Sequence, residues 1–152
     1  MIDNLEQFLR CAAKLEADAA DGYDQLARKM EEAGDAEVTA LFAKFAEFCR
    51  MHHAEVREIQ LAELGRTFDE PLEDVAWPDG HSPEDPLVHA TLEGITPRGA
   101  IEIALETERR ACDFYLGVAG QTRSERIQEL AHEFAEEEAE HVAHLQRWLE
   151  RV

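Results

Sequence analysis

Residues 130–141 read LAHEFAEEEAEH, and residues 41–52, LFAKFAEFCRMH, share leucine, phenylalanine, alanine, glutamate and histidine with them at matching positions. A second pair of segments is also similar in sequence. Residues 16–27 (EADAADGYDQLA) match residues 108–119 (ERRACDFYLGVA) at a glutamate, an alanine, an aspartate, a tyrosine and a final alanine. The segments therefore follow one another as A-B-A-B, which predicts two related helix hairpins. Hairpins that carry glutamate or histidine within their apolar stripes can close around a pair of metal ions.

Length and composition favour a single globular domain over residues 1–152. The chain has 152 residues, of which 45% are hydrophobic and 32% are charged, so it can bury a sizeable core. Its net charge of −19 would repel nucleic acid and anionic membranes, and we expect neither as a partner. The same charge would concentrate cations near the surface.

The termini and cysteines indicate a cytoplasmic protein. The first residues, MIDNLEQFLR, lack the basic and apolar regions of a signal peptide. No window approaches the roughly 20 apolar residues of a membrane span. The three cysteines are odd in number and form no C-x-x-C pair, which favours free thiols in a reducing compartment.

Apolar residues recur at steps of three and four in four segments, which predicts helices over about 4–33, 35–64, 97–120 and 124–151. Between the second and third segments, residues 65–96 are rich in proline and glycine, which excludes a long helix. A short helix could occupy residues 86–92 of this stretch. The length of the stretch suits an end-to-end crossover. We therefore expect an all-α four-helix bundle of two hairpins joined by a long crossover.

Five polar residues interrupt the predicted apolar stripes. A carboxylate in a core is costly unless it is protonated, paired or bound to a cation. Glutamate and histidine three residues apart on one helix face can hold one ion, and carboxylate with imidazole suits iron or manganese. The candidate metal ligands are Glu16, His52, Glu108, Glu138 and His141.

Each candidate also has an ordinary structural interpretation. Glu16 alone could pair with a basic residue near a helix end, and Glu108 has Arg109 and Arg110 beside it. His52 alone could be a hydrogen-bonded core histidine. All five ligand candidates fall at matching places in a duplicated sequence, however, and this conjunction favours a metal site.

The paired motifs resemble the ferritin-like superfamily and, within it, the rubrerythrins. In each half, a glutamate is followed by alanine and tyrosine three and seven residues later, and the next helix carries a histidine at the matching position. The resemblance spans the four helices and implies that the five candidates bind two iron ions. It also implies that Tyr23 and Tyr115 hydrogen-bond ligand carboxylates across the bundle. The implied chemistry is reduction of peroxide or dioxygen, or oxidation of ferrous iron, by a homodimer served by an external electron-donor protein.

The chain departs from the rubrerythrin pattern at three points. Cys49 stands where the motif has a glutamate, and a thiol cannot bridge two ions as a carboxylate does. Cys49 could ligate as a thiolate, favouring zinc or a single iron, or be an inert core residue. Ala111 replaces an extra glutamate of the family, and no rubredoxin-like module is present.

Two further interpretations therefore stand beside the enzymatic one. The bundle could hold a degenerate site with one metal, zinc or none, in a binding or structural role. It could also be a metal-free interaction module whose inward glutamates and histidines pair with one another. Around the site, His144 is expected to lie opposite Glu55. The solvent side of the last helix is expected to carry Glu136, Glu137 and Glu140.

Overall fold

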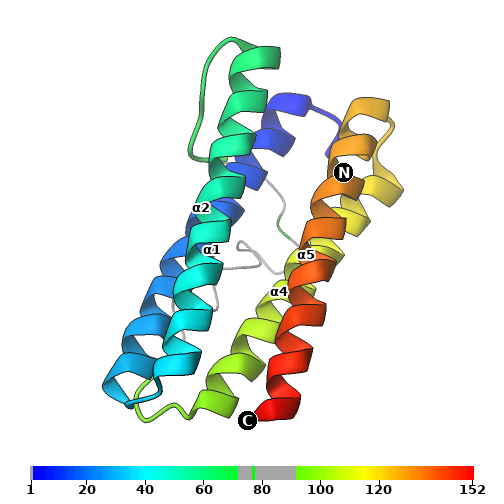
Figure 1. The fold of residues 1–152 in the computed structure, drawn as a ribbon. Helices are drawn as coiled ribbons and strands as arrows, with labels where there is room; N and C mark the ends of the chain where they lie inside the picture. Colours follow the sequence, from blue (N-terminus) through cyan, green and yellow to red (C-terminus); the bar gives the residue numbers. More distant parts are fainter. Residues whose placement is uncertain (1, 72–76, 78–91) are drawn as a thin grey trace.

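The structure, a computed structural model, describes residues 2–71, 77 and 92–152. Its described part is all-α, and the predicted four-helix bundle is confirmed (Figure 1). None of the helices in these residues is both long and apolar enough to cross a membrane. The helices are α1 (Leu5–Glu32), α2 (Ala36–Leu64), α4 (Pro97–Gln121) and α5 (Glu125–Arg151).

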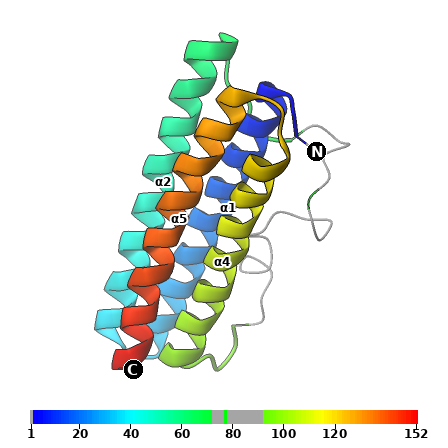
Figure 2. The same ribbon diagram turned by 90° about the vertical axis from the view of Figure 1, so that its right-hand side faces the viewer.

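The helices form two antiparallel hairpins, α1 with α2 and α4 with α5, packed side by side (Figures 1 and 2). Helices α2 and α4 run in the same direction, so the end of α2 and the start of α4 lie at opposite ends of the bundle (Figure 1). Of the connection between them, the structure describes residues 65–71, 77 and 92–96. The short helix predicted for residues 86–92 falls outside the described residues except for Leu92.

Each helix begins at a residue whose side chain accepts a hydrogen bond from the backbone N–H three residues further on. Such a cap satisfies one of the free donors of the first turn and contributes about 1 kcal/mol. Helix α2 ends at Gly65, whose φ of 76° lies in the left-handed region that glycine adopts without strain. The caps are Asn4, Asp35, Thr96 and Ser124.

The core consists of two apolar clusters, one at each end of the bundle. The Tyr23 cluster also contains Phe42 and Phe45, and the Tyr115 cluster also contains Phe8. Burial of each large side chain contributes about 1.5–3 kcal/mol. On every helix, a polar residue lies between the part that belongs to one cluster and the part that belongs to the other. The polar residues of the four helices therefore lie together in the middle of the bundle. These residues are Glu16 in α1, His52 in α2, Glu108 in α4, and Glu138 and His141 in α5.

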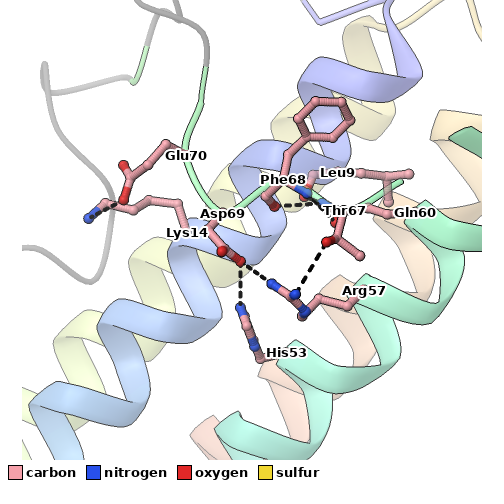
Figure 3. Close-up of polar contacts among 9 residues, drawn as sticks. All are labelled: Leu9, Lys14, His53, Arg57, Gln60, Thr67, Phe68, Asp69 and Glu70. Carbon is pink, nitrogen blue, oxygen red and sulfur yellow. Dashed lines mark hydrogen bonds and ion pairs between the residues drawn. The ribbon is translucent and has the colours of Figure 1, made fainter. Parts of the chain in front are cut away.

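The residues after α2 fold back onto the first hairpin (Figure 3). Gln60 is fully buried, and its amide nitrogen donates to the carbonyl oxygens of Leu9 and Phe68 at 3.1 Å each. Its amide oxygen accepts from the Phe68 backbone N–H at 3.0 Å. Arg57 forms an ion pair with Asp69 beside these bonds. The start of the connection is thereby fixed against α1 and α2.

Candidate metal centre

The five predicted ligands come together from all four helices. Glu16, Glu108 and Glu138 are 3%, 1% and 3% exposed, and the side chains of His52 and His141 are 17% and 11% exposed. Three carboxyl groups therefore share a buried layer with two imidazoles. Among the described residues, the ion-pair partners of Glu16 and Glu108 are these imidazoles rather than a lysine or arginine. Burying so many acidic groups without a cation is costly.

Three of these residues form what we call the inner cluster: Glu108, Glu138 and His141. Each offers one ligand atom, and these atoms all lie within 4.8 Å of one another. His141 Nδ1 lies 3.5 Å from Glu108 Oε2 and 3.7 Å from Glu138 Oε2. The other Glu108 oxygen, Oε1, accepts a 2.5 Å hydrogen bond from the Tyr23 hydroxyl across the two hairpins. This bond holds the carboxylate with its second oxygen toward His141.

Buried polar atoms in this layer lack hydrogen-bond partners. Glu108 Oε2, His141 Nδ1 and His52 Nδ1 are inaccessible to solvent and make no hydrogen bond of ordinary geometry among the described residues. A buried polar atom left without a partner costs about 1–3 kcal/mol. Native proteins keep few such atoms, and a bound ion can supply the partner that they lack. The donor set and these converging atoms therefore fit a divalent cation.

Glu16 and His52 flank the inner cluster. His52 Nδ1 lies 3.9 Å from Glu16 Oε2, beyond hydrogen-bond distance. Glu16 also interacts with the Glu138 side chain. The rings of His52 and His141 stack with centroids 5.5 Å apart and an interplanar angle of 17°. Residues from α1 and α2 thus lie within reach of the same ion or of an adjacent one.

Burial and mutual contacts shift the pKa values of the groups in this layer in different directions. Burial and then repulsion from Glu108 raise the pKa of Glu16 well above its ordinary value. Burial also raises the pKa of Glu108, but contacts with Glu138, His141 and Tyr23 lower it more, so the net shift is downward. Burial lowers the pKa of His141, and Glu108 and nearby carboxylates raise it more. These shifts favour the protonated forms of Glu16 and His141 and the ionised form of Glu108.

Glu137 was expected on the solvent side of the last helix, and this prediction is wrong. Its side chain is 34% exposed, and its Oε2 lies 3.6 Å from His52 Nε2. Burial, followed by repulsion from Glu55, raises the pKa of Glu137 to about 7. Residues 137 and 141 are four apart and share a helix face, which is the sequence signal that could have placed Glu137 here.

Glu137 belongs to a second group of ligand atoms, which we call the outer cluster: His52, Glu55 and Glu137. Their ligand atoms also lie within 4.8 Å of one another. Glu55 was expected opposite His144, but the His144 ring instead packs edge-on against Phe45, with centroids 5.3 Å apart. Glu136 and Glu140 are exposed, as predicted.

Cys49 belongs to the apolar core. It is 1% exposed and lies in the Tyr23 cluster. In the described part of the chain it is a member of neither the inner nor the outer cluster. Tyr115 is also fully buried, and its ring packs against those of Phe8 and Phe134.

A pocket of about 470 Å³ reaches His52 and His141. It lies between α2 and α5, and its polar lining includes His52, His141 and His144. Phe48 from α2 and Arg147 from α5 complete much of its wall. A small solute can therefore approach both candidate imidazole ligands from this side.

Comparison with known proteins supports the fold and names no activity. No protein-family model matches the chain, and no curated protein matches it. A solved structure of an uncharacterized conserved protein from Magnetospirillum magnetotacticum MS-1 is similar, with a TM-score of 0.75 and 28% sequence identity. The match covers 98% of this chain and 95% of that one. The bundle is therefore similar to a solved structure over nearly its whole length.

Proposed function

We propose that the chain is a rubrerythrin-like, ferritin-fold di-metal carboxylate protein, with iron as its expected metal. Its activity would be reduction of peroxide or dioxygen, or oxidation of ferrous iron as a substrate. The observation that carries the proposal is the buried convergence of Glu108, Glu138 and His141, with polar atoms of Glu108 and His141 that lack hydrogen-bond partners. One fold supports many functions, so the proposed function depends on the residues of the site and not on the fold alone.

The inner cluster, with Glu16 beside it, would hold one ion. Tyr23 fixes the orientation of Glu108 by its 2.5 Å hydrogen bond. The lowered pKa of Glu108 keeps this carboxylate ionised and ready to bind. Bound iron would supply the electron-transfer chemistry that these side chains lack.

The surroundings of the site suit a small oxidant. The apolar Tyr23 and Tyr115 clusters exclude water from the bundle above and below the polar layer. The pocket between α2 and α5 leaves His52 and His141 open to a molecule the size of peroxide. Continued turnover would need electrons from another protein, and a homodimer is the expected assembly.

Elemental analysis of protein from iron-supplemented culture tests the proposal. We expect two metal ions per chain in the wild type and loss of the inner ion in Glu108→Gln. Glu133→Gln, which removes an exposed charge from α5, is the matched control and should keep both ions. Absence of metal from the wild type, or equal metal in all three proteins, would refute the proposal.

A second candidate is a degenerate site with one metal, zinc or none, and with a binding or structural role. The observation that favours it is the burial of Cys49 in the apolar core where the family motif has a carboxylate. Cys49→Glu tests this alternative. If the missing carboxylate is the defect, the variant should gain iron and peroxidase activity over the wild type. No gain in either would mean that Cys49 is not the defect.

A further inference from the structure

The two halves of the duplicated sequence place their second carboxylate differently. In α5, Glu138 lies one turn before His141. The matching position in α2 is Cys49, but α2 has Glu55 one turn after His52. The glutamate therefore precedes the histidine in α5 and follows it in α2. Relative to the histidine, these two glutamate positions differ by about two helical turns.

The position of Glu55 on α2 places His52 near two carboxylates, those of Glu55 and Glu137. Helix α5 contributes adjacent glutamates to the two clusters, Glu138 to the inner one and Glu137 to the outer one. Successive helix positions are turned by about 100°, so the two carboxylates point in different directions. Glu137 Oε2 lies 3.6 Å from His52 Nε2, and Glu55 completes a set whose ligand atoms are within 4.8 Å of one another.

The two clusters differ in exposure. Glu108 and Glu138 are 1% and 3% exposed. In the outer cluster Glu137 is 34% exposed and Glu55 is a surface residue. The pocket between α2 and α5 also reaches His52. An ion held by the outer cluster would therefore keep water ligands and exchange with solvent more readily than one in the core.

We propose that His52, Glu55 and Glu137 form an open second metal site at the α2–α5 seam, which replaces the position lost with the carboxylate at Cys49. The site takes a divalent cation such as ferrous iron, manganese or zinc, for which one imidazole and two carboxylates are suitable ligands. It rests on the proposed function in one respect, because it assigns the second of two ions. The two ions are consequently inequivalent: the inner one is retained and the outer one is exchangeable.

Titration of metal-free protein with cobalt(II), followed by visible absorption and by metal analysis after gel filtration, tests this assignment. The wild type should bind two ions with affinities at least tenfold apart. Glu55→Gln and Glu137→Gln should each weaken the second ion more than tenfold and leave the first unchanged. Glu58→Gln and Glu136→Gln, which remove exposed charges from the same helices, should bind both ions as the wild type does.

Two results would overturn the outer site alone. The first is that Glu55→Gln and Glu137→Gln both retain two ions, and the second is that the wild type binds a single ion that Glu108→Gln abolishes. The second of these would leave the inner ion of the proposed function standing. Absence of any bound ion would overturn both proposals together. An anomalous-scattering peak of cobalt among His52, Glu55 and Glu137 in wild-type crystals would support the outer site independently of the variants.

Discussion

Substitution of Tyr23 by phenylalanine removes one hydroxyl from the centre of the bundle and changes little else. Tyr23 is fully buried and Glu108 is 1% exposed, so water cannot replace the lost donor. The ring itself should stay in place, because it packs against Phe42 and Phe45 with centroids 5.9 and 5.3 Å away. Any loss of stability should therefore report on the hydrogen bond to Glu108.

The size of the effect follows from the geometry of this bond. The hydroxyl donates to an ionised carboxylate at 2.5 Å. Hydrogen bonds to charged groups contribute about 1.5–3 kcal/mol, and burial of both partners places this bond near the upper limit. We expect Tyr23→Phe to lower the free energy of unfolding of the metal-free protein by about 3 kcal/mol. For a chain of this length, that corresponds to a fall in Tm of roughly 6–12 °C.

Urea denaturation at pH 7, followed by circular dichroism, measures the loss. A double-mutant cycle separates the hydrogen bond from packing. In a Glu108→Ala background the hydroxyl has lost its acceptor, so Tyr23→Phe should cost less than about 0.5 kcal/mol there. Equal costs in the two backgrounds would refute the claim that Tyr23 acts through Glu108.

Two further predictions concern pH: the effect of Glu137 on stability, and the effect of Glu16 and His141 on metal affinity. Because the pKa of Glu137 is about 7 in the folded protein, its contribution to stability is fully present below its unfolded pKa and is lost as pH rises through 7. Allowing for solvent screening, Glu137→Gln should recover about 1 kcal/mol of this loss at pH 8, while Glu136→Gln should not, as urea denaturation at pH 5 and 8 will show. The pKa values of Glu16 and His141 are both raised, so metal binding to these groups should release protons and affinity should rise between pH 6 and 8. Calorimetry in buffers of different ionisation enthalpy should detect protons released, and no release would count against both residues as ligands.

The fold could be predicted from the sequence because local signals agree with the tertiary structure. Apolar steps of three and four mark the buried faces, and cap residues such as Ser124 and Thr96 occur where the helices begin. The proline-rich stretch separates the hairpins. The duplicated motif identifies the polar layer because its residues occupy core positions where an unpaired charge is costly.

The surroundings of the layer could not be predicted in the same way. Glu137 looks like a solvent-facing residue because it has glutamates on both sides. Its approach to His52 depends on how α5 is rotated and spaced relative to α2, which packing sets and periodicity does not. The hydrogen bond from Tyr23 to Glu108 joins residues 85 positions apart and was accessible only through the family resemblance.

Anomalous diffraction at the iron edge, on crystals grown from iron-loaded protein, would examine the polar layer most directly. We expect one peak within bonding distance of Glu108, Glu138 and His141, and a second, weaker peak on the His52 side. A bundle centre without anomalous signal, in protein shown to be exposed to ferrous iron, would contradict the metal centre inferred from these side chains.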